Sequence, residues 1–147
     1  QNVGAGHWQR VHATARAGLL CNLLLTGGLV LAVLALDGHA LALFLPPASP
    51  ALETAQHLNR VILGSFVLLG VTWVLSGVMR STGAVWVPLA ILAAGLLGVR
   101  LPVAYWLQGW WGEQALWWSF PIGALASMLL SIAYYRLGHW RHARWLD

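Results

Sequence analysis

The stretch AGLLCNLLLTGGLVLAVLAL, residues 17–36, contains no charged side chain over 20 consecutive positions. A helix of about 20 apolar residues rises about 30 Å, which matches the hydrocarbon thickness of a bilayer. Three further runs of comparable length also lack charge, at residues 61–79, 81–99 and 114–135. Segments of about ten residues with alternating polarity, which a membrane β-barrel requires, do not recur. The sequence therefore predicts an all-α integral membrane protein with four transmembrane helices.

Turn-forming residues separate these runs, at residues 37–39, 46–50, 81–83 and 108–113. Ser49 is expected to cap the second helix, with Pro50 as its first residue and Glu53 beside the positive end of the helix dipole. The predicted spans cover approximately residues 14–37, 52–80, 85–108 and 115–137. Residues 138–147 are expected to form a basic tail.

The composition excludes a soluble enzyme, because 59% of the residues are hydrophobic and only 8% are charged, where about 25% is usual. Disordered chains are polar and charged, and a disulfide scaffold needs more than the one cysteine, Cys21. A net charge of +4 raises the question of nucleic acid. Six of the eight arginines lie at chain ends and span boundaries, and the arginines form no contiguous basic face, so we expect membrane lipid as a partner and no nucleic acid.

The arginines also predict orientation, since short loops rich in Lys and Arg stay in the cytoplasm. One side of the membrane receives six of them: Arg10, Arg16, Arg80, Arg136, Arg141 and Arg144. The loops on the other side carry the acids Asp37, Glu53 and Glu113. Both termini are therefore expected to be cytoplasmic. Seven tryptophans near predicted span ends are typical of an aromatic belt: Trp86, Trp106, Trp110, Trp111, Trp117, Trp118 and Trp140.

Two arginines fall within the predicted spans, Arg60 and Arg100, and intramembrane charges are the default candidates for function. Glu53, Gln56, His57 and Arg60 follow i, i+3, i+4, i+7 spacing and so share one helical face. This face predicts a solvated cleft wall that includes His57, Arg60 and Arg100. The alternative is an arginine that extends toward the surface and pairs with Glu53.

Asn22 and Thr26 lie one turn apart on the first span and are further cleft candidates, although hydrogen bonds between helices are the favoured interpretation. Thr72, Ser76 and Arg80 repeat this spacing on the second span. Small residues predict close packing of the last two spans, at Ala90, Ala94 and Gly98 and at Gly123, Ser127 and Ser131.

No catalytic residue is expected, because neither a nucleophile nor an acid–base pair is visible. Only His57 of the six histidines lies within a span, so neither a metal site nor a pair of haem ligands is expected. Cys21 lies in an apolar run without an activating neighbour and is expected to be a small core residue.

Four segments together resemble the multidrug and toxic compound extrusion (MATE) family of transporters. Residues 1–6, with Arg10 shortly after, resemble the loop before the family's ninth helix, and residues 76–83 resemble the end of its tenth helix. Residues 99–105 resemble the Arg-x-Pro-x-Ala-Tyr stretch of the eleventh helix, and residues 134–136 close a twelfth. The positions that carry the resemblance, taken as structural, are Gln1, Asn2, Gly4, Gly6, Gly77, Arg80, Gly83 and Pro102.

The resemblance implies a twelve-helix transporter with two six-helix lobes, of which this chain would be the C-terminal part of the second lobe. The first residue is Gln1, and the eight N-terminal helices would be partners. The implied activity is cation-coupled export of drugs or toxic organic compounds, most simply organic cations, by H⁺ or Na⁺ antiport across a bacterial cell inner membrane. The protein would be no enzyme and would need no cofactor besides the coupling ion.

This chain departs from the family pattern after Gly83 and within the tenth helix, where it lacks the acidic residues that some members carry. The coupling site is therefore expected outside this chain. Two alternatives stay open: a lipid-linked sugar flippase of the same broad superfamily, and a four-helix membrane anchor or haem-carrying subunit.

Overall fold

The computed structural model describes residues 1–46 and 49–142, and within these residues every regular element is helical. Four helical stretches are long and apolar enough to cross a membrane, which confirms the predicted fold class. They are α1 (Trp8–Ala42), α2 (Pro50–Arg80), the continuous run Trp86–Trp111, and α5 (Glu113–Leu137). A short 3₁₀ turn, η2 (Trp140–His142), follows. Arg144 and the second half of the predicted tail, residues 143–147, lie outside the described residues.

The first helix is longer than predicted, because it continues through the expected turn at residues 37–39 and ends at Ala42. A single glycine inside a helix costs only about 1 kcal/mol relative to alanine. Asp37 also has a partner within the bundle, since its Oδ1 accepts a hydrogen bond from Asn59 Nδ2. Asp37 therefore lies inside a helix pair and not in an external loop.

The second helix begins where the sequence predicts. Ser49 Oγ accepts a hydrogen bond from the Ala51 backbone N–H at 3.3 Å, Pro50 is the first helical residue, and Glu53 lies in the first turn. The cap confirms the interpretation of Ser49, Pro50 and Glu53 as a helix start.

The third span consists of three helical segments, α3 (Trp86–Ala93), the π-helix η1 (Ala94–Arg100) and α4 (Leu101–Trp111). Pro102 explains the wide segment, because proline has no N–H to donate and its ring collides with the carbonyl four residues earlier. The helix then continues through the expected loop at residues 108–111. Gly112 alone separates α4 from α5, and its φ of +58° is one that glycine adopts without strain.

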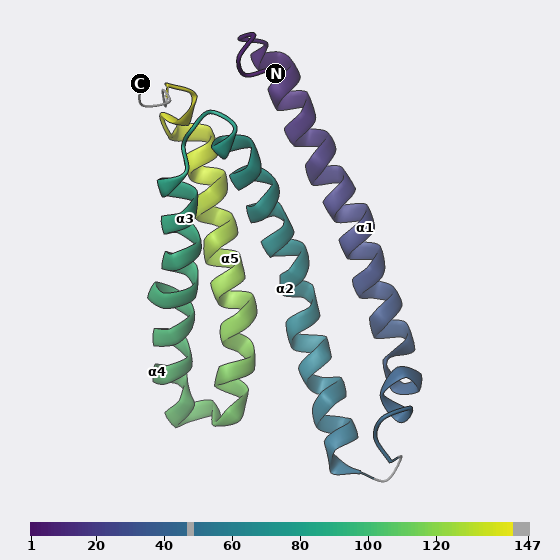
Figure 1. Ribbon diagram of the computed structural model, residues 1–147. Helices are drawn as coiled ribbons and strands as arrows, with labels where there is room; N and C mark the ends of the chain where they lie inside the picture. Colours follow the sequence, from purple (N-terminus) through teal and green to yellow (C-terminus); the bar gives the residue numbers. More distant parts are fainter. Residues whose placement is uncertain (47–48, 143–147) are drawn as a thin grey trace.

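The four spans lie side by side in an open row, in the order α1, α2, α5 and then α3–η1–α4 (Figure 1). The central helix α2 packs against α1 on one side and α5 on the other, while α5 also packs against η1 and α4. The start of α1 and the end of α5 lie at the same end of this row (Figure 1).

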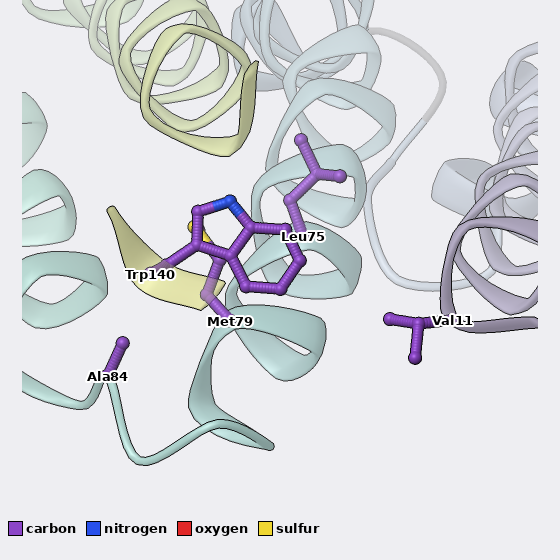
Figure 2. Close-up of a cluster of buried hydrophobic side chains, with 5 residues drawn as sticks. All are labelled: Val11, Leu75, Met79, Ala84 and Trp140. Atoms are coloured by element: carbon purple, nitrogen blue, oxygen red, sulfur yellow. The ribbon is translucent and has the colours of Figure 1, made fainter. Parts of the chain in front are cut away.

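A buried apolar cluster closes the end of the bundle that carries the termini (Figure 2), and it consists of Val11, Leu75, Met79, Ala84 and Trp140. The Trp140 side chain is 0% exposed. Its indole Nε1 donates to Tyr135 O at 2.8 Å, and Thr82 Oγ1 donates to Trp140 O at 2.6 Å. The prediction that Trp140 belongs to an interfacial belt is therefore wrong, because its chain segment turns back onto α2 and α5.

Two further expectations about packing are wrong. Cys21 is exposed on α1, because only a narrow face of this helix meets α2. On the third span, Ala90, Ala94 and Gly98 are exposed, while Pro88, Ile91 and Gly95 are buried. The spacing predicted that the face with Ala90, Ala94 and Gly98 packs against a neighbour. Several faces of this span carry small residues, however, and the face with Gly95 is the buried one. The matching expectation for α5 is confirmed, since Gly123, Ser127 and Ser131 are buried.

Candidate functional site

The strongest candidate site is a cavity of about 280 Å³ lined by α2, the last turn of α3, the π-helix and α5. It combines one cation, two aromatic rings and two hydroxyls with an apolar lining. The polar and aromatic members are Ser65, Trp73, Arg100, Phe120 and Ser127. A small, mostly apolar cavity with a few fixed polar groups is typical of a site for an organic molecule.

Arg100 is the only charged residue that lines this cavity. Its Cζ lies 3.3 Å from the centroid of the Phe120 ring, so the guanidinium is held by the negative face of the aromatic ring. Arg100 is the last residue of the π-helix, and it is half-buried. The wide turn before Pro102 thus determines where the Arg100 side chain leaves the backbone, and π-helical turns of this kind are frequent at functional sites.

Two glycines allow the π-helix and α5 to approach closely beside the cavity. A Cβ atom on Gly123 would lie 2.9 Å from Arg100 Cβ and 3.1 Å from the Gly95 carbonyl oxygen. A Cβ atom on Gly95 would overlap the Ser127 side chain. Neither position tolerates a side chain without movement of its neighbours, so Gly95 and Gly123 set the depth of the Arg100 cavity.

The other two predicted cleft residues on α2 do not line this cavity. The His57 ring contacts the Trp117 ring of α5, with centroids 5.4 Å apart and an interplanar angle of 55°. Arg60 and Glu53 are both exposed. The structure therefore brings His57 to α5 and Arg100 to the cavity without joining them into one pocket, and their part in a substrate path stays a prediction.

Asn22 connects α1 to α2, and Thr26 holds the Asn22 side chain from within α1. Asn22 Nδ2 donates to the Val67 carbonyl oxygen at 3.1 Å, and Thr26 Oγ1 donates to Asn22 Oδ1 at 3.1 Å. The Asn22 amide lies against Gly70, where a Cβ atom would collide with it. The bond from Asn22 to Val67 is the hydrogen bond between helices that the sequence favoured over a ligand site, whereas the bond from Thr26 stays within α1.

The motif residues near the termini gather at one place, although they come from two distant segments. Gln1, Asn2, Gly4 and Gly77 line a larger cavity of about 1010 Å³ between the start of α1 and the end of α2. Gly6 and Gly83 have positive φ angles of 70° and 87°, which glycine adopts without a steric penalty.

The remaining two motif positions have separate structural roles. Arg80 is exposed, and its Nε donates to the Ser76 carbonyl oxygen at 3.3 Å. Pro102 follows the π-helix and lies within the first turn of α4. Residues 1–6 and 76–83 therefore shape the end of the bundle that carries the termini, whereas Pro102 shapes the Arg100 cavity.

Sequence analysis missed the pairing of Asp37 with Asn59. Asp37 is 6% exposed, and the distance between its Oδ1 and Asn59 Nδ2 is 2.5 Å. One signal could have found the pair, because both residues lie equally far in sequence from residue 48 and an antiparallel helix hairpin places such residues at the same depth. Among the described residues, no group of three or more His, Cys, Asp or Glu side chains could hold a metal ion.

Comparison with known proteins places these features in a family. The MatE family model matches residues 1–106. A Bacillus subtilis (strain 168) protein named "Probable multidrug resistance protein YoeA" is 30% identical over 138 residues, which cover 92% of this chain and 30% of the relative. No solved structure matches the chain. The chain belongs to the MatE family, that is, the multidrug and toxic compound extrusion transporters, and it spans less than a third of the length of this relative.

Proposed function

We propose that this MATE-family chain forms the last four helices of a two-lobed, twelve-helix transporter that exports drugs or toxic organic compounds in exchange for H⁺ or Na⁺. The observation that carries the proposal is the family match over residues 1–106. The name of the Bacillus relative supports export of drugs. Such a transporter moves its substrate unchanged, so we propose no enzymatic reaction.

The arrangement of the helices supports a multi-pass protein of the cell inner membrane with both termini in the cytoplasm. The start of α1 and the end of α5 lie at one end of the row, as four spans require (Figure 1). Arg10, Arg16, Arg80 and Arg136 all lie near the ends of helices that reach this end. An arginine-rich end is the cytoplasmic end under the positive-inside rule.

The Arg100 cavity forms part of the proposed substrate path. Trp73 offers an aromatic face, which attracts organic cations in the same way that the Phe120 ring holds the Arg100 guanidinium. His57 and Arg60 would contact substrate elsewhere on the path, while Asn22 and Thr26 position α1. The carboxylate that couples export to the ion gradient would lie in the first helix of the transporter, outside these residues.

The test is efflux of ethidium, a fluorescent organic cation, from an efflux-deficient strain that expresses the full transporter. Arg100→Ala should lower the initial efflux rate about tenfold, because the guanidinium that packs on the Phe120 ring holds that ring in place beside the cavity. Arg60→Ala should lower it less, because Arg60 is exposed. Membrane abundance of both variants should stay within about twofold of wild type, since neither residue is part of the buried core.

Arg10→Ala is the matched control, because Arg10 is exposed at the end that carries the termini, and it should leave efflux unchanged. Removal of both the H⁺ and the Na⁺ gradient should stop export by the wild type. Wild-type rates in both Arg100→Ala and Arg60→Ala would contradict the proposed site, and a wild type that exports no organic compound would contradict the proposed function.

A further inference from the structure

A buried carboxylate near the end of the bundle opposite the termini has no role in the substrate path described above. Asp37 is 6% exposed and lies on α1, which in the described chain packs against α2. Its Oδ1 accepts a hydrogen bond from Asn59 Nδ2 at 2.5 Å. Its Oδ2 is buried and has no hydrogen-bond partner among the described residues. One of the two carboxylate oxygens therefore receives no hydrogen bond from the described residues.

None of the ionisable side chains near Asp37 on α1 and α2 is buried beside its carboxylate. His39 lies two residues after Asp37 on α1, Arg60 directly follows Asn59 on α2, and both side chains are exposed. Glu53 on α2 is also exposed and has the same sign of charge as Asp37. Asp37 Oδ2 is therefore a buried oxygen that is available to bind a proton or a cation.

Asn59 is suited to both charge states of its partner. Its amide N–H donates to a carboxylate, as the structure shows. Its amide oxygen accepts a hydrogen bond from a protonated carboxyl group, or coordinates a sodium ion, after rotation of the side chain. The pair can therefore satisfy itself with or without the added cation.

We propose that Asp37 and Asn59 form a site that takes up and releases a monovalent cation, a proton or a sodium ion, during the transport cycle. The proposal rests on the proposed transport function and adds a site in this chain to the coupling carboxylate expected in the first helix. Because the pair joins α1 to α2, its charge state changes the strength of their contact near one end. The cation thereby biases how far α1 separates from α2.

The experiment uses the full transporter in proteoliposomes with ethidium as substrate, energised by a pH gradient alone or by a sodium gradient alone. In wild type, one of the two gradients drives uptake and identifies the cation. Asp37→Asn should lower gradient-driven uptake about tenfold or more, because the amide can neither bind a proton in this range nor attract sodium. Exchange of external for internal ethidium without any gradient should persist, since the substrate path is intact.

Glu53→Gln is the matched control, because it removes an exposed carboxylate at the same end of the bundle, and it should retain gradient-driven uptake. Asp37→Glu keeps the ionisable group and should restore part of the response. If Asp37→Asn fails to accumulate, Asn59→Ala provides the second variant and should shift the pH or sodium dependence of uptake. A purely structural role would lower abundance without such a shift.

Gradient-driven uptake at the wild-type rate in Asp37→Asn would overturn this inference and leave the proposed function standing. Loss of both gradient-driven uptake and exchange in a properly inserted Asp37→Asn would also overturn it, since Asp37 would then serve the substrate path. Wild-type protein that transports under neither gradient would instead contradict the proposed function.

Discussion

The helices α1 and α5 are both long and apolar, yet they are held in the bundle in different ways. Over its 35 residues α1 buries Val11, Ala15 and Asp37, and all three lie toward its ends. Over its 25 residues α5 buries six, and all six are small: Ala115, Ser119, Gly123, Ala124, Ser127 and Ser131. The middle of α1 contacts α2 through the Asn22 amide, whereas α5 meets its neighbours along its length.

This difference indicates which contacts can open during transport. Small residues let α5 approach η1 until backbone atoms nearly touch, and such packing is lost only as a whole. Hydrogen bonds between membrane helices contribute about 0.6–1.7 kcal/mol each, so the Asn22 bond adds little to the cost of separating α1 from α2. The exposed leucines along α1 must be covered by lipid or by other helices of the transporter.

The largest effect is expected where α5 meets the π-helix. Gly95→Val should destabilise the transporter by about 3 kcal/mol, because its Cβ overlaps the Ser127 side chain and approaches the Gly123 carbonyl oxygen to 3.1 Å. Backbone atoms cannot rotate away, so the helices must separate and the Arg100 cavity must change shape. Thermal unfolding of the full transporter in detergent, monitored by size-exclusion chromatography, measures the loss of stability.

Gly98→Val provides the control, because Gly98 belongs to the same π-helix and a Cβ there meets nothing within 4 Å. Both substitutions carry the same change in helix propensity, so only the contact with α5 distinguishes them. Equal destabilisation by Gly95→Val and Gly98→Val would mean that α5 is held no more tightly than α1.

A smaller effect is expected for the contact between α1 and α2. Gly70→Ala should cost about 1 kcal/mol, because its Cβ displaces the Asn22 amide and breaks its hydrogen bond to the Val67 carbonyl oxygen. The Asn22 side chain can rotate away, which limits the cost. The same thermal measurement applies, together with accessibility of Cys21 on α1 to a membrane-permeant maleimide.

The double variant Asn22→Ala with Gly70→Ala separates the collision from the lost hydrogen bond. Its destabilisation should be smaller than the sum of the two single effects, since either change removes the same bond. Gly64→Ala on α2 is the control, because its Cβ would meet nothing within 4 Å. Additive effects of Asn22→Ala and Gly70→Ala would show that the two residues do not interact.

The sequence was sufficient for the fold class because charge-free runs of membrane length allow few other structures. It also predicted the start of α2, where Ser49, Pro50 and Glu53 act through local backbone chemistry. The sequence did not predict the features that depend on contacts between residues far apart in the chain. The α1 helix passes through residues 37–39 because Asp37 has Asn59 as a partner, and no local rule contains that contact.

The candidate site was predicted only in part, because it also depends on contacts between residues far apart in the chain. Arg100 is recognisable because a charge within a span is costly, but its cavity depends on the π-helix and on Gly95 and Gly123. Trp140 was misplaced, because a tryptophan at a span end is typical of the interface and only the turn back onto Met79 and Leu75 buries it (Figure 2). Periodicity along one helix does not determine which face meets a neighbour.

The smallest effect is expected within α5 itself, at two serines that are both 0% exposed. Ser131 Oγ has no hydrogen-bond partner among the described residues, so Ser131→Ala removes an unsatisfied hydroxyl and should be neutral or stabilising by up to about 1 kcal/mol. Ser119 Oγ donates to the Leu116 carbonyl oxygen at 2.6 Å, and Ser119→Ala should therefore destabilise by about 0.5–1 kcal/mol. Thermal unfolding of both variants in detergent gives the difference in sign. A loss of stability in Ser131→Ala as large as that in Ser119→Ala would show that Ser131 binds a partner elsewhere in the transporter, and α5 would then carry a polar contact comparable to that of Asn22 on α1.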